Sequence, residues 1–228
     1  IKYYVFNFSE RFKEDVMDRF VDAYEHGCTP NPCIDCNRYL KFDKMFQRMR
    51  ELEYDYIVTG HYARVEYDKD LGRYVLKKAV DDTKDQSYVL YMLTQEQLAH
   101  LSLPLGNLRK SQVREIARQH GLINSEKHDS QDICFVPDGN YAGFIEKYTG
   151  HPSVEGNFVD KNGKILGRHK GIIHYTPGQR RGLGIPDTER LYVCDISPET
   201  NQVILGHHED LFHSQLTAGQ VNLITCDN

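Results

Sequence analysis

The chain has 228 residues, 39% of them hydrophobic and 27% charged, and a formal net charge of −5. This composition is that of an ordinary globular protein with one large or two smaller domains. It contains no apolar run long enough to span a bilayer. Its six irregularly spaced cysteines are too few for a disulfide scaffold, so we expect a cytoplasmic protein in which any disulfide is transient.

The first half of the chain alternates between strand and helix patterns. Strands are expected over residues 1–8, 54–61 and 72–80, and helices over 9–27, 38–52, 86–93 and 108–121. Ser9 is the expected cap of the first helix and Gly27 its end. Such alternation predicts an α/β fold with a parallel sheet, in which ligands bind at the carboxyl ends of the strands.

The pattern changes near Cys134, and we place a domain boundary between residues 135 and 155. A short helix around 140–148 precedes a segment rich in glycine and strand patterns. Hairpins are expected over 158–167, with Asn162-Gly163 as a two-residue turn, and over 191–206. The last nine residues read as a strand and a turn.

The segment NPCIDCN contains a CxxC pair, Cys33 and Cys36, with no second pair elsewhere. Three interpretations compete: half of a zinc site, a redox dithiol, or one nucleophilic cysteine with a distant partner. His26, Cys28, Cys33 and Cys36 form a compact set of potential zinc ligands, but prolines stiffen the loop between them and no metal site is predicted. A dithiol of the thioredoxin type would follow a strand, whereas this pair follows a proline-rich loop.

Local physics favours a reactive thiol at Cys36. Asn37 is a suitable cap for a helix that begins at Arg38, and the positive end of the helix dipole with Arg38 and Lys41 would lower the pKa of Cys36. The alternative is a small buried thiol, the interpretation that suits cysteines 28, 194 and 226. Cys134 lies in HDSQDICFVPDG, a loop at the domain junction, and such loops often contain catalytic residues. Sequence spacing does not show that Cys36 and Cys134 meet.

Several long motifs occur in series: TPNPCIDCNRYLKF, TGHYARV, KDQSYVLYML, LGNLRKSQVREIA, DSQDICF and YTPGQRRGLG. From about residue 1 to 212 they resemble the tRNA-specific 2-thiouridylases. The resemblance implies a partial parallel-sheet nucleotide-binding domain of the adenine nucleotide alpha hydrolase type over 1–140. A small β-rich tRNA-binding domain over 141–208 and the start of a C-terminal β-barrel over 209–228 would follow.

The resemblance implies that ATP, with Mg²⁺, activates C2 of the wobble uridine of tRNA as an adenylate, and that a cysteine persulfide delivers sulfur. By motif, Cys134 carries the persulfide, and Cys36 is the nucleophile that frees the sulfur and leaves a transient Cys36–Cys134 disulfide. Attack of a thiolate on a persulfide is ordinary thiol exchange. The implied partners are tRNA and a sulfur donor, either a cysteine desulfurase or a sulfur-relay protein.

Other positions carry over in the same way. Gly60 resembles a glycine that binds ATP, because the missing side chain lets the ligand approach the backbone. The positions that resemble tRNA or substrate contacts are Asn31, Pro32, Cys33, His61, Lys84, Asp85 and Gln86. Without the resemblance, His61 would be read as a structural histidine, and residues 84–86 as a solvated loop.

Two departures from the family pattern stand out. Some members have aspartate at the position of Cys33, so an acid/base role there would fall to water, to Asp35 or to another residue. The glycine- and serine-rich phosphate loop and most of the barrel are absent, so we expect this fragment to be inactive alone. The alternatives are a non-catalytic tRNA-binding module and another ATP-dependent RNA thiolation enzyme.

Residues 161–186 contain lysines and arginines but no acidic residue. Such a stretch, with Arg180 and Arg181 in its QRRG motif, suits contacts with RNA phosphates, which fix register without reading sequence. The other interpretation is a solvated basic hairpin, and the resemblance favours tRNA.

Overall fold

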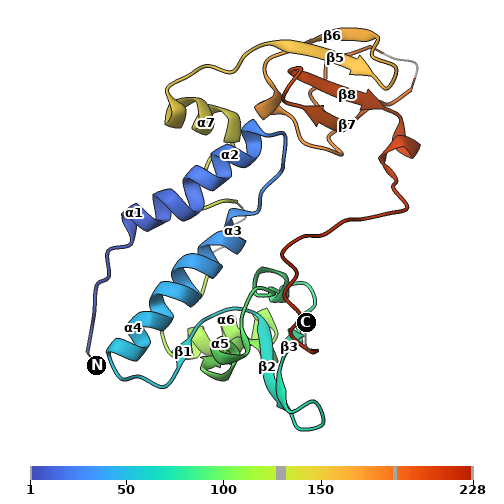
Figure 1. Ribbon diagram of the computed structural model, residues 1–228. Helices are drawn as coiled ribbons and strands as arrows, with labels where there is room; N and C mark the ends of the chain where they lie inside the picture. The colour runs from blue at the N-terminus through green and yellow to red at the C-terminus, as the bar shows by residue number, and fades with distance from the viewer. Residues whose placement is uncertain (1, 127–131, 187–188, 227–228) are drawn as a thin grey trace. The chain divides into compact units, whose positions relative to one another are not determined.

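The computed structural model describes residues 2–126, 132–186 and 189–226 (Figure 1). The chain forms two compact units that are not continuous in sequence. The first unit comprises residues 1–15, 33–129 and 218–228, and the second comprises 16–32 and 130–217. None of the described helices is long and apolar enough to cross a membrane.

The first expected helix is present as α1 (Ser9–Phe12), a π-helical stretch (Lys13–Asp18) and α2 (Arg19–Glu25). Gly27, at φ 70°, follows its end as predicted. Ser9 is not the cap: Asn7 Oδ1 accepts hydrogen bonds from the backbone N–H of Ser9 at 3.0 Å and from its hydroxyl at 2.7 Å. An asparagine side chain thus meets the helix start.

The expected strand over 1–8 is wrong for its described part. Residues 2–8 are irregular, and no described segment pairs with their backbone. The alternation is still visible as stacked rings, with centroids 6.2 Å apart for Tyr4 and Phe6 and 6.0 Å apart for Phe6 and Phe8. A strand pattern produces a strand only where a partner supplies hydrogen bonds.

The second helix begins earlier than expected. It runs through α3 (Pro32–Asp35), a π-helical stretch (Cys36–Lys44) and α4 (Met45–Glu51). Proline is favoured at a first helical position because its missing N–H is not needed there. Asn37 is therefore no cap: it is buried, and its Nδ2 donates to the carbonyl of Val89 at 3.4 Å. Cys36 lies in the second turn, where the helix dipole has largely faded, so that argument for its low pKa is wrong.

The rest of the first unit combines a parallel pair with an antiparallel hairpin. Strands β1 (Ile57–Val58) and β4 (Leu101–Ser102) pair in parallel, and β2 (Ala63–Asp68) pairs with β3 (Arg73–Lys78) antiparallel. Helices α5 (Gln95–Ala99) and α6 (Lys110–Gln119) follow, the latter closed by Gly121 at φ 62° as predicted. Two short 3-10 turns span Ser87–Val89 and Pro104–Asn107.

The helix expected over 86–93 is wrong, since only the turn Ser87–Val89 is helical. The backbone N–H of Gln86 donates to the carbonyl of Tyr62 at 2.8 Å, which ties the start of this segment to the residues that precede β2. Leu90 and Leu93 then enter the hydrophobic core of the first unit. The main members of that core are Phe42, Phe46, Met49, Ile57, Ala63, Leu90, Leu93 and Leu98.

The second unit contains α7 (Tyr141–Thr149) and a four-stranded sheet in the order β6-β5-β8-β7 (Figure 1). The strands are β5 (Gly156–Asp160), β6 (Ile165–His169), β7 (Tyr192–Ser197) and β8 (Gln202–Gly206), and 3-10 turns span Ile172–His174 and His208–Leu211. Both expected hairpins are present, and β5 also pairs with β8 in parallel.

Two details of the second half differ from expectation. The β5–β6 loop has three residues rather than two, because Asp160 N donates to Lys164 O at 2.9 Å and Gly163 alone adopts a positive φ, 83°. The strand expected at the C-terminus is wrong for its described part, 220–226, which is irregular. There Asn222 Nδ2 donates to the carbonyls of Tyr91 at 2.7 Å and Leu93 at 3.0 Å, within the first unit.

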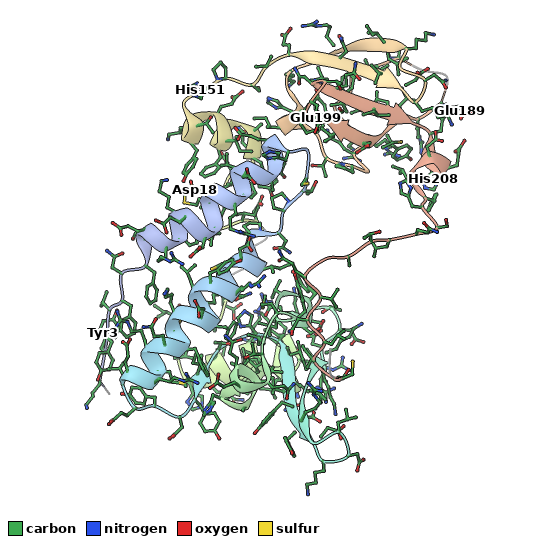
Figure 2. All side chains as sticks on the ribbon, in the orientation of Figure 1. Tyr3, Asp18, His151, Glu189, Glu199 and His208 are labelled. Carbon is green, nitrogen blue, oxygen red and sulfur yellow. The ribbon has the colours of Figure 1, made fainter. Side chains whose placement is uncertain are left out.

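The second unit has two hydrophobic clusters. One lies within the sheet around Phe158, Val193 and Val203, and the other joins α2 to α7. The α2–α7 cluster comprises Phe20, Val21, Tyr24, Ala142, Ile145 and Ile173. Asp18, labelled in Figure 2, accepts a hydrogen bond from the hydroxyl of Tyr148 beside this cluster.

Candidate functional site

A pocket opens at the carboxyl end of β1, the place where parallel α/β sheets bind ligands. Its volume is about 370 Å³, and it is lined by Lys41, Met45, Val58, Thr59, Gly60, His61 and Gln86. Gly60, His61 and Gln86 were predicted from the sequence as site residues, and the fold brings them together. Lys41 and Thr59 were not predicted as site residues, although both lie in quoted motifs, because neither residue type indicates a place in this pocket without the fold.

His61 is held as a neutral imidazole. Its side chain is buried, its Nδ1 lies 2.8 Å from Thr59 Oγ1, and its ring centroid lies 5.9 Å from that of Phe42. Burial and, secondly, the positive charge of Lys41 lower the pKa of His61 to about 4. His61 is therefore uncharged at neutral pH and offers a ligand one ring nitrogen, Nε2, beyond its contact with Thr59.

The segment 84–86 is fixed rather than solvated. Asp85 accepts hydrogen bonds from Ala79 N at 2.8 Å and from Ser87 Oγ at 2.7 Å. Gln86 Oε1 accepts from Tyr62 N at 3.0 Å. Asp85 thus holds the loop in place, and the Nε2 amide is the end of Gln86 that remains for a ligand.

Gly60 fits the approach of a ligand such as ATP to its backbone. A Cβ placed on Gly60 would meet only Leu105 Cδ1, at 3.6 Å, an ordinary van der Waals distance. The packing of the protein therefore does not require glycine at this position. A ligand against the backbone would require it, so the residues present fit the nucleotide that the sequence predicts.

The cysteines of interest lie in different parts of the chain. Cys33 is exposed in the first turn of the second helix, and Cys36 is half-buried one turn later. Asn31 is exposed and Pro32 buried at the same helix start. Cys36 belongs to the first unit and Cys134 to the second, and the pairing of the two thiols stays a prediction.

Cys134 is an exposed thiol on an anchored turn. The turn is closed by a hydrogen bond from Val136 N to Ile133 O at 2.9 Å, and the side chain of Val136 is buried. On the other side, the ring of Phe135 packs edge-on against Phe20 with centroids 5.3 Å apart. The neighbours of Cys134 hold the backbone while its sulfur remains accessible.

A carboxylate supports the same turn. Asp132 accepts hydrogen bonds from Ile133 N at 2.8 Å and from the hydroxyl of Tyr141, the first residue of α7. The Tyr141 hydroxyl holds the pKa of Asp132 below its usual value, and Asp132 in turn raises the pKa of Tyr141 to about 12. This pair was not predicted from the sequence.

Arg180 and Arg181 are exposed in a loop pinned to β7, because Gly178 N donates to Val193 O at 2.7 Å and Val193 N donates to Gln179 O at 2.9 Å. The basic stretch 161–186 is less uniform than its sequence implies. Lys161 pairs with Asp210 at 2.8 Å and Arg168 with Glu155 at 3.2 Å, both acids from outside the stretch. The two arginines are the better candidates for phosphate contacts.

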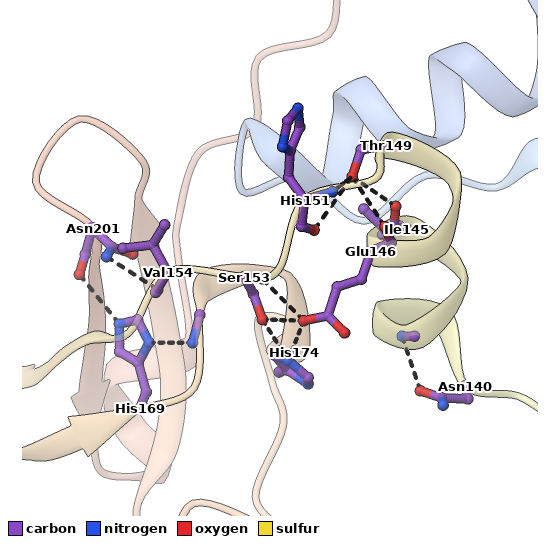
Figure 3. A network of polar contacts seen from close by, with 12 residues as sticks. Asn140, Ile145, Glu146, Thr149, His151, Ser153, Val154, His169, His174 and Asn201 are labelled. Carbon is purple, nitrogen blue, oxygen red and sulfur yellow. Dashed lines mark hydrogen bonds and ion pairs between the residues drawn. The ribbon is translucent and has the colours of Figure 1, made fainter.

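A polar network within the second unit joins α7 to Ser153 and to the 3-10 turn Ile172–His174 (Figure 3). Glu146 Oε1 accepts from Ser153 N at 3.0 Å and from the Ser153 hydroxyl, and lies 3.9 Å from His174 Nε2. Ser153 Oγ also lies 3.1 Å from His174 Nε2. Ser153 and Glu146 both lie next to Nε2 of His174. A serine-hydrolase relay needs the serine and the carboxylate on opposite ring nitrogens, so these three residues do not form one. Their contacts fix the segment between α7 and β5.

Among the residues that the structure describes, no group of three histidine, cysteine or acidic side chains is placed to hold a metal ion.

Comparison with known families identifies the chain. Residues 1–138 match the family described as "tRNA methyl transferase HUP domain", and 142–207 match "tRNA methyl transferase PRC-barrel domain". The chain belongs to this family. The tRNA methyl transferase HUP and PRC-barrel pair confirms the predicted fold class, a nucleotide-binding α/β domain followed by a β-rich one. The finer domain bounds stay a prediction.

Curated relatives in this family include proteins named "tRNA-specific 2-thiouridylase MnmA". The chain is 52% identical over 227 residues to those of Clostridioides difficile and Lachnoclostridium phytofermentans, and 50% identical over 228 residues to that of Clostridium kluyveri. Each match covers 100% of this chain and 63–64% of the relative. The chain spans less than two thirds of their length, and the predicted resemblance is confirmed at the level of the family.

Proposed function

We propose that the protein containing this chain is a tRNA 2-thiouridylase, a sulfurtransferase that replaces O2 of the wobble uridine with sulfur. The observation that carries the proposal is the exposed Cys134 thiol on a turn anchored by Val136 and Phe135. A persulfide carrier must be reachable by its donor and its acceptor, and must be held in place between the two. The names of the curated relatives support the same reaction.

Each candidate residue takes one part of the reaction. ATP, which Gly60 would help to hold together with Mg²⁺, would transfer AMP to O2 of the uridine and release pyrophosphate, so that O2 could later leave C2 as part of AMP. The Cys36 thiolate attacks Sγ of persulfidated Cys134, the S–S bond breaks, and the terminal sulfur leaves as hydrosulfide, which attacks C2 and displaces AMP together with O2. One disulfide, Cys36–Cys134, forms in each turnover, and an external dithiol must reduce it. A cysteine desulfurase or sulfur-relay protein reloads Cys134.

The tRNA would contact both units. His61 and Gln86 are the candidates at the pocket. Lys84 and Asp85, in the adjoining loop, and residues 31–33, at the helix start, are further candidates, whereas Arg180 and Arg181 would bind backbone phosphates. Asp85 supports the pocket through the hydrogen bonds it accepts.

A second candidate is methyl transfer to tRNA, because the family description uses those words. That reaction would need a methyl donor but neither a persulfide nor Cys134. The cysteine variants below separate the two activities.

The test uses the full-length protein and measures 2-thiouridine in tRNA. Cys36→Ser and Cys134→Ser should each abolish thiouridine formation and leave tRNA binding nearly unchanged. Cys33→Ser should remain active, and Cys194→Ser is the matched control. After sulfur loading, mass spectrometry should find the persulfide on Cys134 and not on Cys36. Full activity of Cys134→Ser would refute the proposal, and persulfide on Cys36 alone would reverse the two roles.

A further inference from the structure

The pocket at the end of β1 contains a cation with no assigned role. Lys41 is half-buried and lines the pocket with Gly60, His61 and Gln86. Within the described ranges, no carboxylate forms an ion pair with Lys41, and no acidic residue lines the pocket. A lysine that is removed from bulk water without an acidic partner retains its capacity to bind an anion.

The other polar groups of the pocket are hydrogen-bond donors or can become donors. Gln86 Oε1 accepts a hydrogen bond from Tyr62 N, which leaves the Nε2 amide of Gln86 for a ligand. His61 Nδ1 contacts Thr59 Oγ1, which leaves Nε2 of the ring for a ligand. Gly60 leaves its backbone open to the pocket. One ammonium group, one amide and one imidazole around an open glycine suit a ligand that offers several acceptor oxygens and a negative charge.

We propose that Lys41 forms a phosphate-binding subsite of this pocket, in which it binds a phosphate group beside His61 and Gln86. The inference deepens the proposed function and rests on it, since ATP and tRNA both bring phosphates to this site. The proposed role of Lys41 is in binding only: its ammonium group offsets the negative charge of the phosphate and fixes the position of that group.

A direct readout follows from the contact between Lys41 and His61. The lysine charge contributes to the lowered pKa of His61, so an anion bound at Lys41 should raise that pKa. The same anion favours the tautomer of His61 that carries its proton on Nε2.

The experiment follows the His61 ring signal by NMR in the full-length protein, assigned by its loss in His61→Gln. Inorganic phosphate, ATP and tRNA are the three probes, and pH is varied with and without each. Lys41→Met is the main variant, Lys41→Arg keeps the charge, and Lys44→Met makes the same change on the same helix outside the pocket. Thermal unfolding establishes that each variant is folded.

In the wild-type protein, phosphate and at least one of the other probes should raise the pKa of His61. Lys41→Met should raise the pKa of free His61, abolish the response and weaken binding about tenfold or more. Lys44→Met should behave as wild type, and Lys41→Arg should retain most binding. A response to ATP but not tRNA identifies the nucleotide as the source of the phosphate, and the converse identifies RNA.

Unchanged binding in Lys41→Met, or no response of wild-type His61 to any probe, would overturn the subsite. Thiouridine formation is measured separately in the same variants. A protein that binds phosphate through Lys41 but makes no thiouridine would contradict the proposed function and leave the subsite intact.

Discussion

Gly60→Ala should separate stability from ligand binding. The added Cβ meets only Leu105 Cδ1, at 3.6 Å, and Gly60 has no positive φ. The folded protein therefore accepts a methyl group without displacement of its neighbours. The proposed nucleotide would not accept it, because the methyl group would occupy the space through which the nucleotide would approach the backbone.

The expected change in stability is small and favourable. Alanine restricts the unfolded chain more than glycine does, which stabilises a compatible site by about 0.4–1 kcal/mol. For a protein of this size, 1 kcal/mol corresponds to about 2–4 °C in Tm. The contrast is Gly106→Ala, where the added Cβ would lie 1.8 Å from the carbonyl oxygen of Ala63. That overlap cannot be relieved without moving β2, so Gly106→Ala should unfold the first unit.

The assay combines thermal unfolding with calorimetric ATP binding in the full-length protein. Gly60→Ala should have an unchanged or slightly raised Tm and ATP affinity lowered at least tenfold. Wild-type ATP affinity in Gly60→Ala would refute the close approach of the nucleotide to this backbone. A Tm lowered as far as in Gly106→Ala would refute the steric argument itself.

Three further outcomes are expected. Arg180→Ala with Arg181→Ala should weaken tRNA binding and flatten its dependence on salt, because fewer counterions are released, and an unchanged slope would make these residues solvated surface. Tyr141→Phe should raise the pKa of Asp132 and slow sulfur transfer from Cys134 without affecting tRNA binding, which persulfide kinetics and carboxyl NMR can check. His61 has a folded pKa of about 4, below its ordinary 6.5, so its neutral form contributes stability that is complete above pH 6.5 and lost as pH falls towards 4. Urea unfolding across this range should show a shallower loss in His61→Gln than in wild type.

The sequence predicted those elements whose signals are local. The helix over α1–α2, helix α7 and both hairpins of the second unit follow from periodicity and turn residues that need no distant partner. The failures have non-local causes. Residues 2–8 carry a strand pattern without a described partner strand, and the start of 86–93 is tied by hydrogen bonds to the chain around Tyr62.

The site divides in the same way. Gly60, His61 and Gln86 could be predicted because they lie in recognisable motifs, and the fold gathers them at one pocket. Lys41 and Thr59 also lie in quoted motifs, but their place in the pocket could not be predicted, because it comes from three-dimensional proximity to His61. Asn37 shows how a local rule misleads: its side chain suits a cap, but the helix began earlier at Pro32 and left Asn37 in the core.

The cluster between α2 and α7 determines how the protein can be divided for expression. The two matched family regions meet between residues 138 and 142, which suggests a convenient place to cut. Yet Phe20, Val21 and Tyr24 pack against Ala142 and Ile145, which lie beyond that cut. A product ending at 138 would expose this face to water at a cost of about 1.5–3 kcal/mol for each large apolar side chain. We expect such a product to aggregate, and expect the remaining 142–207 piece to require residues 16–32 supplied as a separate peptide.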